Sequence, residues 1–255
     1  MSAKKRMNKH SGRRRFLLSA ASFVFSIAVV AILFGGGGWW LLAHPESPVP
    51  SHWNPLRELK ITAPVTPITR FQLNRALANE VQCRAALADA GANFETMDDL
   101  IVDENCGITG RGLLSALVTS GVNAVETSCA TTLRLAMWEH HVVQPTARDL
   151  LGTQVGRLRH VGSYNCRQMR TAQGQSSGWS SHAKAESIDI VGLQFADRRS
   201  LTLLSDWGAD GPEGQFLRQI WRGACDWFRV VLGPDFNHLH ADHFHLQGPG
   251  WGYCQ

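Results

Sequence analysis

The longest apolar stretch of the chain runs from Phe16 to Phe34 and contains no charged residue. A helix over this stretch is roughly 28 Å long, close to the thickness of the hydrocarbon core of a bilayer. Seven Lys and Arg residues precede it, which favours a cytoplasmic N-terminus. The pattern therefore predicts a basic cytoplasmic tail over residues 1–15 and a single transmembrane anchor over residues 16–43, in the inner membrane of a bacterium.

Two cleaved export signals are alternatives to a retained anchor. A signal peptide ends in a small-x-small site, for which LLA at residues 41–43 is a weak match. The run RRRFL at residues 13–17 resembles a twin-arginine signal. Under all three interpretations, the residues from about 45 onward lie outside the cytoplasm, in the periplasm.

The apolar pattern changes after the membrane segment. Six of the ten prolines fall in residues 44–68, which is typical of an extended linker. The globular domain is then predicted over residues 69–255. Its first helix is expected to begin at Thr69, as the capping residue, and to end near Ala90, because apolar residues recur at every fourth position. The residues on this apolar face are Leu73, Leu77 and Val81.

Three later segments are also predicted to be helical. Helices are predicted from Ser128 to His141, from Pro145 to Leu150 and from Pro212 to Leu232. His140 and His141 fall at the end of the first of these, where the simplest role of a histidine is a favourable positive charge at the helix C-terminus.

Strand-like patterns dominate the second half of the chain. In SIDIVGLQF (187–195), Ile188 and Ile190 share one face and Asp189 points to the other. The segment 94–124 is mixed and rich in Gly. Further strands are predicted over residues 155–166, 198–207 and 236–247. The expected fold class is α+β, with helices from the first half packed on a mostly antiparallel sheet from the second half.

Charge excludes one class of partner. The formal net charge of +4 comes from the N-terminal tail, since the residues after 15 carry 18 basic and 21 acidic side chains. A mildly acidic globular part without a basic stripe argues against nucleic-acid binding.

The six cysteines are expected to form disulfides. None lies in a CxxC pair, so a thiolate zinc site is disfavoured, and an exported domain with an even number of cysteines favours three disulfides. Fifteen pairings are possible. The simplest is sequential: Cys83–Cys106, Cys129–Cys166 and Cys225–Cys254.

Histidines concentrate near the C-terminus. FNHLHADHFHLQ (236–247) holds four of the eleven histidines, and SSHAKAESIDIVG (180–192) adds His182 and Asp189. Imidazole and carboxylate groups are typical ligands of catalytic zinc. His243 and His245 are two positions apart on a predicted strand, so one can bind the metal while the other acts as an acid or base. We expect the two stretches to meet around one Zn²⁺ ion; the alternative is a surface histidine cluster that binds metal adventitiously.

The order of several motifs resembles the bacterial extensin-like C-terminal domain family over residues 50–255. These motifs are WNPLREL (53–59), CG (106–107), SYNCR (163–167), the two histidine-bearing stretches and the final cysteine. That family is similar to zinc peptidases of the lysostaphin, D-Ala-D-Ala peptidase and hedgehog groups, whose signature is SxHxxGxAxD followed by HxH. Here Ser180, His182 and Asp189 match that signature, while Ala185 and Ser187 replace its Gly and Ala.

The resemblance implies a specific ligand set. The metal ligands would be His182, Asp189 and His245, with His243 as the catalytic partner that does not bind the metal. The fold would be the helix-on-antiparallel-sheet type of these peptidases.

Three further residues acquire roles by resemblance alone. HADHFH (240–245) resembles the HxxHFH of penicillin-insensitive murein endopeptidases, which adds His240 to the active site. Asp242 takes the place of an acidic base, and Arg167 that of an arginine that contacts the substrate or the developing oxyanion. The implied activity is a DD-endopeptidase or DD-carboxypeptidase acting on peptidoglycan stem peptides. The alternatives are a peptidoglycan-binding module without catalysis and a metal-binding envelope protein unrelated to the wall.

Overall fold

The computed structural model describes residues 4–171 and 173–255, with side chains in the first helix from residue 23 onward. The chain forms two compact units, one that ends at Arg57 and one from Glu58 to Gln255. Residues 58–68, which the proline spacing assigns to a linker, belong to the second unit, because Leu59 and Ile61 are buried in its core.

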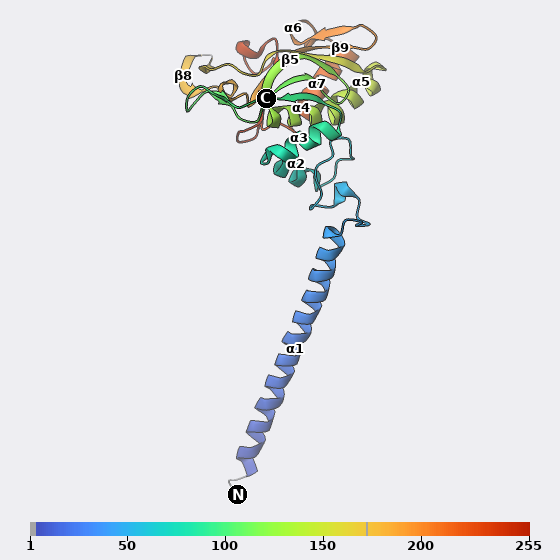
Figure 1. Ribbon diagram of the computed structural model, residues 1–255, viewed down its shortest axis with the longest axis vertical. Helices are drawn as coiled ribbons and strands as arrows, with labels where there is room; N and C mark the ends of the chain where they lie inside the picture. Colours follow the sequence, from blue (N-terminus) through green and yellow to red (C-terminus); the bar gives the residue numbers. More distant parts are fainter. Residues whose placement is uncertain (1–3, 172) are drawn as a thin grey trace. The chain divides into compact units, whose positions relative to one another are not determined.

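The first unit consists mainly of helix α1 (Lys4–Ala43), drawn in blue in Figure 1. Its segment Phe23–Ala43 has 21 residues and a mean hydropathy of 1.9, so it is long and apolar enough to cross a membrane. The basic side chains of residues 4–15 lie outside the described side chains. After α1 the chain is not simply extended, since the Asn54 amide donates to the Leu42 carbonyl.

Within the described residues, nine strands of the second unit form one sheet. Their order is β1 (Asn93–Thr96), β4 (Arg111–Ala116), β5 (Gly121–Ser128), β6 (Val155–Gly162), β9 (Ser187–Phe195), β12 (Phe244–Gln247), β11 (Val230–Leu232) and β13 (Tyr253–Cys254), with β10 (Ser200–Thr202) paired to β9. Only the β5–β6 and β11–β13 pairs are parallel among these described strands. Two small hairpins are separate: β2 (Leu100–Ile101) with β3 (Gly107–Ile108), and β7 (Gln168–Thr171) with β8 (Gly174–Trp179).

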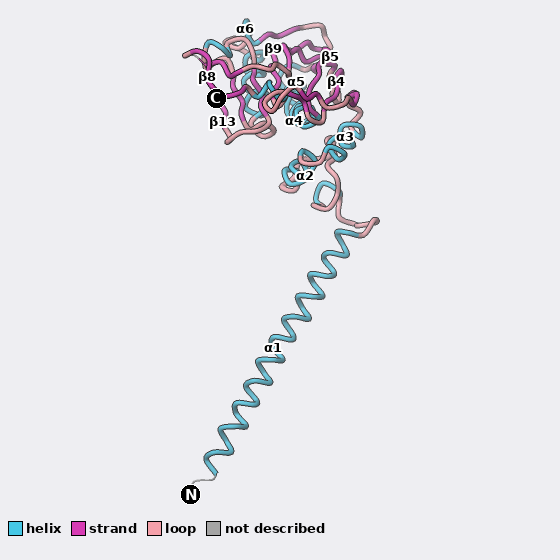
Figure 2. The backbone as a smooth tube through the Cα atoms, turned by 60° about the vertical axis from the view of Figure 1, so that its left-hand side comes forward, coloured by secondary structure: helices cyan, strands magenta, loops and turns pink. Residues whose placement is uncertain are grey.

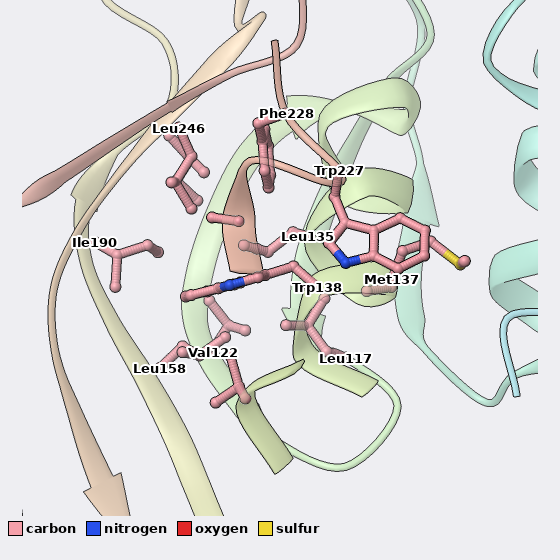
Figure 3. Packing of buried hydrophobic residues seen from close by; sticks show 14 of the residues in the cluster. Leu117, Val122, Leu135, Met137, Trp138, Leu158, Ile190, Trp227, Phe228 and Leu246 are labelled. Atoms are coloured by element: carbon pink, nitrogen blue, oxygen red, sulfur yellow. The ribbon is translucent and has the colours of Figure 1, made fainter. Parts of the chain in front are cut away.

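Helices cover this sheet and close the core. They are α2 (Thr69–Leu77), α3 (Glu80–Asp89), α4 (Cys129–Trp138), α5 (Gln144–Leu151), α6 (Leu203–Asp206) and α7 (Pro212–Ala224). α4 packs against β4 and β5, and α7 packs against α5; Figure 2 shows α4 and α5 beside the strands. Leu158 and Ile190 of the sheet and Leu135 and Trp138 of α4 belong to the core cluster drawn in Figure 3.

The predicted α+β class with a mostly antiparallel sheet is confirmed, but the expected division between the two halves of the chain is wrong. The strands β1, β4 and β5 come from the first half of the chain. Short strands in the Gly-rich segment 94–124 have too little periodicity to be assigned from the pattern alone.

The helix predicted from Thr69 to Ala90 is two helices. Asn79 interrupts it, because its side chain accepts a hydrogen bond from the Gln82 N–H and caps α3. Val81, expected on the apolar face, is 78% exposed. Thr69 begins α2 rather than capping it, and its hydroxyl accepts from the N–H of Thr66.

The predicted helices over residues 128–150 form one continuous helical segment. Ser128 caps α4, and a π-helical turn (Glu139–Val143) joins α4 to α5. His141 does not carry the positive charge that was expected for it at a helix C-terminus. Burial, with a contribution from His140, lowers its pKa to about 4, so its ring is neutral at pH 7, and the ring stacks on Trp227 with 5.4 Å between centroids.

Two elements predicted near the C-terminus are shorter than expected, and a different kind of secondary structure follows each of them. The strand predicted over residues 198–207 ends at Thr202. The Thr202 hydroxyl accepts a hydrogen bond from the Ser205 N–H and so caps the N-terminus of α6. The helix predicted to Leu232 ends at Ala224. The β-branched pair Val230 and Val231 pairs with β12 instead, so local strand preference and an available sheet edge override the helical spacing.

The disulfides are Cys83–Cys129, Cys106–Cys166 and Cys225–Cys254. The predicted Cys225–Cys254 pair is confirmed, and the other two predicted pairs are wrong. Sequential pairing overlooks the packing of α3 beside α4, which brings Cys83 to the first residue of α4.

Candidate functional site

Strand register places two of the predicted metal ligands opposite each other. β9 and β12 are antiparallel neighbours, and Asp189 is the direct partner of His245. Directly opposed residues on adjacent strands project from the same face of a sheet. Ile188 and Ile190 are fully buried on the core side, which turns Asp189 to the other face. As a result, His245 Nδ1 lies 2.9 Å from Asp189 Oδ1.

His182 reaches the same point from a 3-10 turn, η3 (Ser181–Lys184). The Ser180 hydroxyl caps this turn by accepting from the His182 N–H. Ala185 closes the turn in the left-handed conformation, with φ 49°, at the position where the peptidase signature has Gly. The Ala185 carbonyl is held by a hydrogen bond from the buried Ser128 hydroxyl, which stabilises a conformation that is unfavourable for Ala.

Together the three side chains form a compact, buried donor set. His182 Nε2 lies 3.1 Å from Asp189 Oδ2 and 3.3 Å from His245 Nδ1. One potential ligand atom from each residue lies within 4.8 Å of the other two. His182 is 4% exposed and His245 9% exposed, so few waters compete with a bound ion on this side.

Hydrogen bonds fix which ring nitrogen of each histidine is available. His182 Nδ1 lies 2.9 Å from the Ser163 carbonyl, which can only accept, so Nδ1 carries the hydrogen and Nε2 keeps its lone pair. Gln247 donates its amide nitrogen to the Pro249 carbonyl, which leaves its oxygen 3.2 Å from His245 Nε2. His245 Nε2 therefore donates and Nδ1 keeps its lone pair. The two lone pairs and the carboxylate face one another, an arrangement that favours a cation between them and fits zinc.

Electrostatics favour an ionised Asp189. Burial raises the pKa of its carboxyl, but hydrogen bonds from His182 and His245, when those rings carry a second proton, outweigh burial and hold the pKa well below its usual range. The site thus offers a cation a carboxylate whose ionised form its two histidine neighbours favour.

His243 approaches the three ligands from the turn before β12. Its Nδ1 lies 2.8 Å from Asp242 Oδ1, and its Nε2 lies 3.7 Å from Asp189 Oδ1. Asp242, to which the resemblance assigns the place of an acidic base, is largely exposed, and its carboxylate contacts His243. The strand expected over residues 236–247 is shorter than predicted, since only Phe244–Gln247 belongs to the sheet.

His240 lies in a second 3-10 turn, η4 (His238–His240), on the same side. Its ring centroid is 5.2 Å from that of His243 and 5.9 Å from that of His245. Burial, and then the neighbouring histidines, lower the pKa of His240 to about 4, so it is neutral at pH 7. Its Nδ1 bonds to the Asn237 side-chain oxygen, which leaves Nε2 as an acceptor.

Most of the chain matches the model of a known protein family. A model of the family described as "Extensin-like protein C-terminus" matches residues 81–255. The chain belongs to this family. No curated protein and no solved structure matches the chain. All the site residues described above lie within the extensin-like match, and α1 lies outside it.

The extensin-like domain has a cleft of ≈ 1040 Å³ above the three ligands. Arg167 lines it and follows Cys166, whose disulfide to Cys106 anchors this part of the chain. Burial, and then the charge of Arg170, lower the pKa of Arg167, while Asp189 acts in the opposite sense. Arg170 and Lys184 also line the cleft, although the sequence did not single them out.

Sequence reasoning also missed the two groups that orient the histidines. Gln247 lies two positions after His245 on the same face of β12, so strand periodicity contained a signal for it. Ser163 acts through its backbone carbonyl, for which side-chain patterns contain no signal.

Proposed function

We propose that this extensin-like protein is a zinc-dependent peptidase that acts on peptidoglycan stem peptides, as a DD-endopeptidase or DD-carboxypeptidase on the periplasmic side of the inner membrane. The observation that carries the proposal is the convergence of His182, Asp189 and His245 at the floor of an open cleft. The likeness of their spacing to the signature of the lysostaphin, D-Ala-D-Ala peptidase and hedgehog groups supports the choice of substrate.

The donor atoms define how zinc would be held. His182 would bind it through Nε2, His245 through Nδ1 and Asp189 through a carboxylate oxygen. Bound zinc would polarise the scissile carbonyl and activate a water for attack on the amide. The Ser163 carbonyl and the Gln247 amide keep the two rings in the tautomers that this requires.

His243 is the residue best placed to move a proton. Because its Nδ1 hydrogen is directed to Asp242, its Nε2 lone pair is free, 3.7 Å from Asp189 Oδ1. Nε2 would take a proton from the attacking water and return it to the amine that leaves. The Asp242 carboxylate would stabilise the imidazolium in between, as an orienting carboxylate does for a general base.

The charge of the cleft fits an acidic peptide. Arg167, Arg170 and Lys184 line it, and Glu186 and Asp189 are the acidic residues of the lining. If Asp189 binds the metal, the three cationic side chains of the cleft lining face one remaining acidic side chain, that of Glu186. Stem peptides carry free carboxylates, which guanidinium groups bind in a bidentate way.

The test uses the full-length chain in detergent micelles, loaded with zinc and incubated with purified sacculi. New amino groups and shortened muropeptides are the expected products, and His182→Ala or His245→Ala should abolish them. His238→Ala is the matched control, because His238 lies in the same stretch but is exposed and does not line the cleft. Muropeptides that stay intact after prolonged incubation with the zinc-loaded protein would contradict the proposal.

One observation favours a second candidate function, a peptidoglycan-binding module without catalysis. Ala185 and Ser187 replace the Gly and Ala of the peptidase signature, so the chain departs from those peptidases within the segment that carries two of its proposed ligands. Binding to sacculi without cleavage, unchanged by Asp242→Asn and by His243→Gln, would favour this module over the peptidase.

A further inference from the structure

A second cavity, of ≈ 240 Å³, lies on a different part of the globular unit. No described residue lines both this cavity and the cleft. Three arginines from separate elements meet in its lining: Arg70 of α2, Arg134 of α4 and Arg229 just before β11. The disulfide Cys225–Cys254 forms part of the wall and ties the C-terminal strand to this region.

The charge in this cavity is not balanced by the protein. Within the described part of the chain, no ion pair joins any of the three arginines to a carboxylate. Asp226 is the acidic side chain of the described lining. Three guanidinium groups and one carboxylate leave two positive charges uncompensated.

Arg134 is held in place rather than mobile. Its Nη1 donates to the Trp227 carbonyl at 2.6 Å, which leaves Nε and Nη2 for another partner. Burial, with a contribution from the Arg229 charge, lowers the pKa of Arg134 to about 10, so it stays protonated at pH 7. Arg229 is oriented in turn by its Nε, which donates to the Gly250 carbonyl at 3.2 Å. Arg229 is exposed and Arg134 is partly buried, and their charges repel each other, so an anion that contacts both guanidinium groups would bind favourably.

We propose that this cavity binds a small dianionic oxyanion of the phosphate-monoester class, with Arg70, Arg134 and Arg229 as its donors. Guanidinium groups match the geometry of phosphate oxygens, and a dianion neutralises the two excess charges. The cavity is several times larger than the roughly 30 Å³ that a water molecule occupies in the liquid, so it admits a phosphate with a small organic group attached. That phosphate belongs either to a soluble ester or to the headgroup of a lipid.

Isothermal titration calorimetry tests this with the metal-free full-length chain in a maltoside detergent. Inorganic phosphate and glycerol 3-phosphate should each bind saturably, at one site per chain. Arg70→Gln and Arg229→Gln should each weaken binding about tenfold or more, as expected for the loss of a charge-assisted hydrogen bond. Arg222→Gln is the control for net charge, because Arg222 is an exposed residue of α7 outside the cavity. Arg170→Gln, which removes a cation of the cleft, should leave phosphate binding unchanged.

The source of the phosphate is decided by competition. Micelles doped with phosphatidic acid should displace glycerol 3-phosphate if the ligand is a lipid headgroup, and should not if it is a soluble ester. No saturable binding, binding that survives both Arg70→Gln and Arg229→Gln, or equal affinity for acetate and phosphate would overturn the proposal.

Discussion

Replacement of Gln247 by Leu perturbs the metal centre without removing a ligand. The substitution deletes the oxygen that accepts from His245 Nε2 and so allows the proton to move to Nδ1, the atom that faces Asp189. Loss of such an outer partner typically lowers metal affinity about 10–100-fold, which corresponds to about 1.4–2.8 kcal/mol. The Ser181 hydroxyl, 3.5 Å from the same Nε2, remains as a weaker acceptor, so we expect the lower end of this range.

The assay is zinc competition against a chromophoric chelator at pH 7. Gln175→Leu is the matched control, because Gln175 is exposed on β8 and does not line the cleft. Metal-free thermal unfolding should show that Gln247→Leu folds like the wild type. A zinc affinity within about twofold of wild type in a normally folded variant would refute the argument that Gln247 fixes the tautomer of His245.

Three further predictions concern the proton path, a disulfide and a buried imidazole. Asp242→Asn should lower kcat on muropeptides about tenfold or more without weakening zinc binding, because His243 loses its orienting carboxylate; a parallel loss of zinc would contradict this. Alanine at both Cys83 and Cys129 should lower the free energy of unfolding in urea by roughly 4 kcal/mol, since the bridge spans 46 residues; a loss below about 1 kcal/mol would argue against this pairing. Burial lowers the folded pKa of His141 to about 4, whereas an unfolded imidazole titrates near about 6.5. The unfolded state therefore binds the proton first as pH falls, and wild-type stability should decrease between these two values; His141→Phe should remove that part of the decrease, and parallel stability profiles would contradict it.

Local periodicity accounts for much of what was predictable. Alternation in β9 puts Asp189 on the face opposite Ile188 and Ile190, as the structure has it. The apolar N-terminal stretch is helical, as its composition predicts, and α4 lies where the pattern predicts a helix. Each of these features depends on residues within a few positions of one another, where sequence patterns are most informative.

What the pattern missed depends on residues far apart in the sequence. The pairing of β9 with β12 sets Asp189 against His245, and no local pattern contains that register. The same holds for the Cys83–Cys129 disulfide, which needs α3 beside α4. Asn79 is a different case, because the preference of Asn for helix N-caps is a local signal. The apolar spacing continues on both sides of Asn79, so the pattern predicts one helix where the structure has α2 and α3.

X-ray absorption spectroscopy of the zinc-loaded full-length chain tests the metal centre most directly. We predict one zinc per chain with nitrogen and oxygen neighbours at about 2.0–2.2 Å and the scattering of two imidazoles. His182→Ala should remove one imidazole from the spectrum, whereas His238→Ala should leave it unchanged. A zinc spectrum that is the same with and without His182, or a zinc shell of oxygen alone, would contradict a centre built from His182, Asp189 and His245.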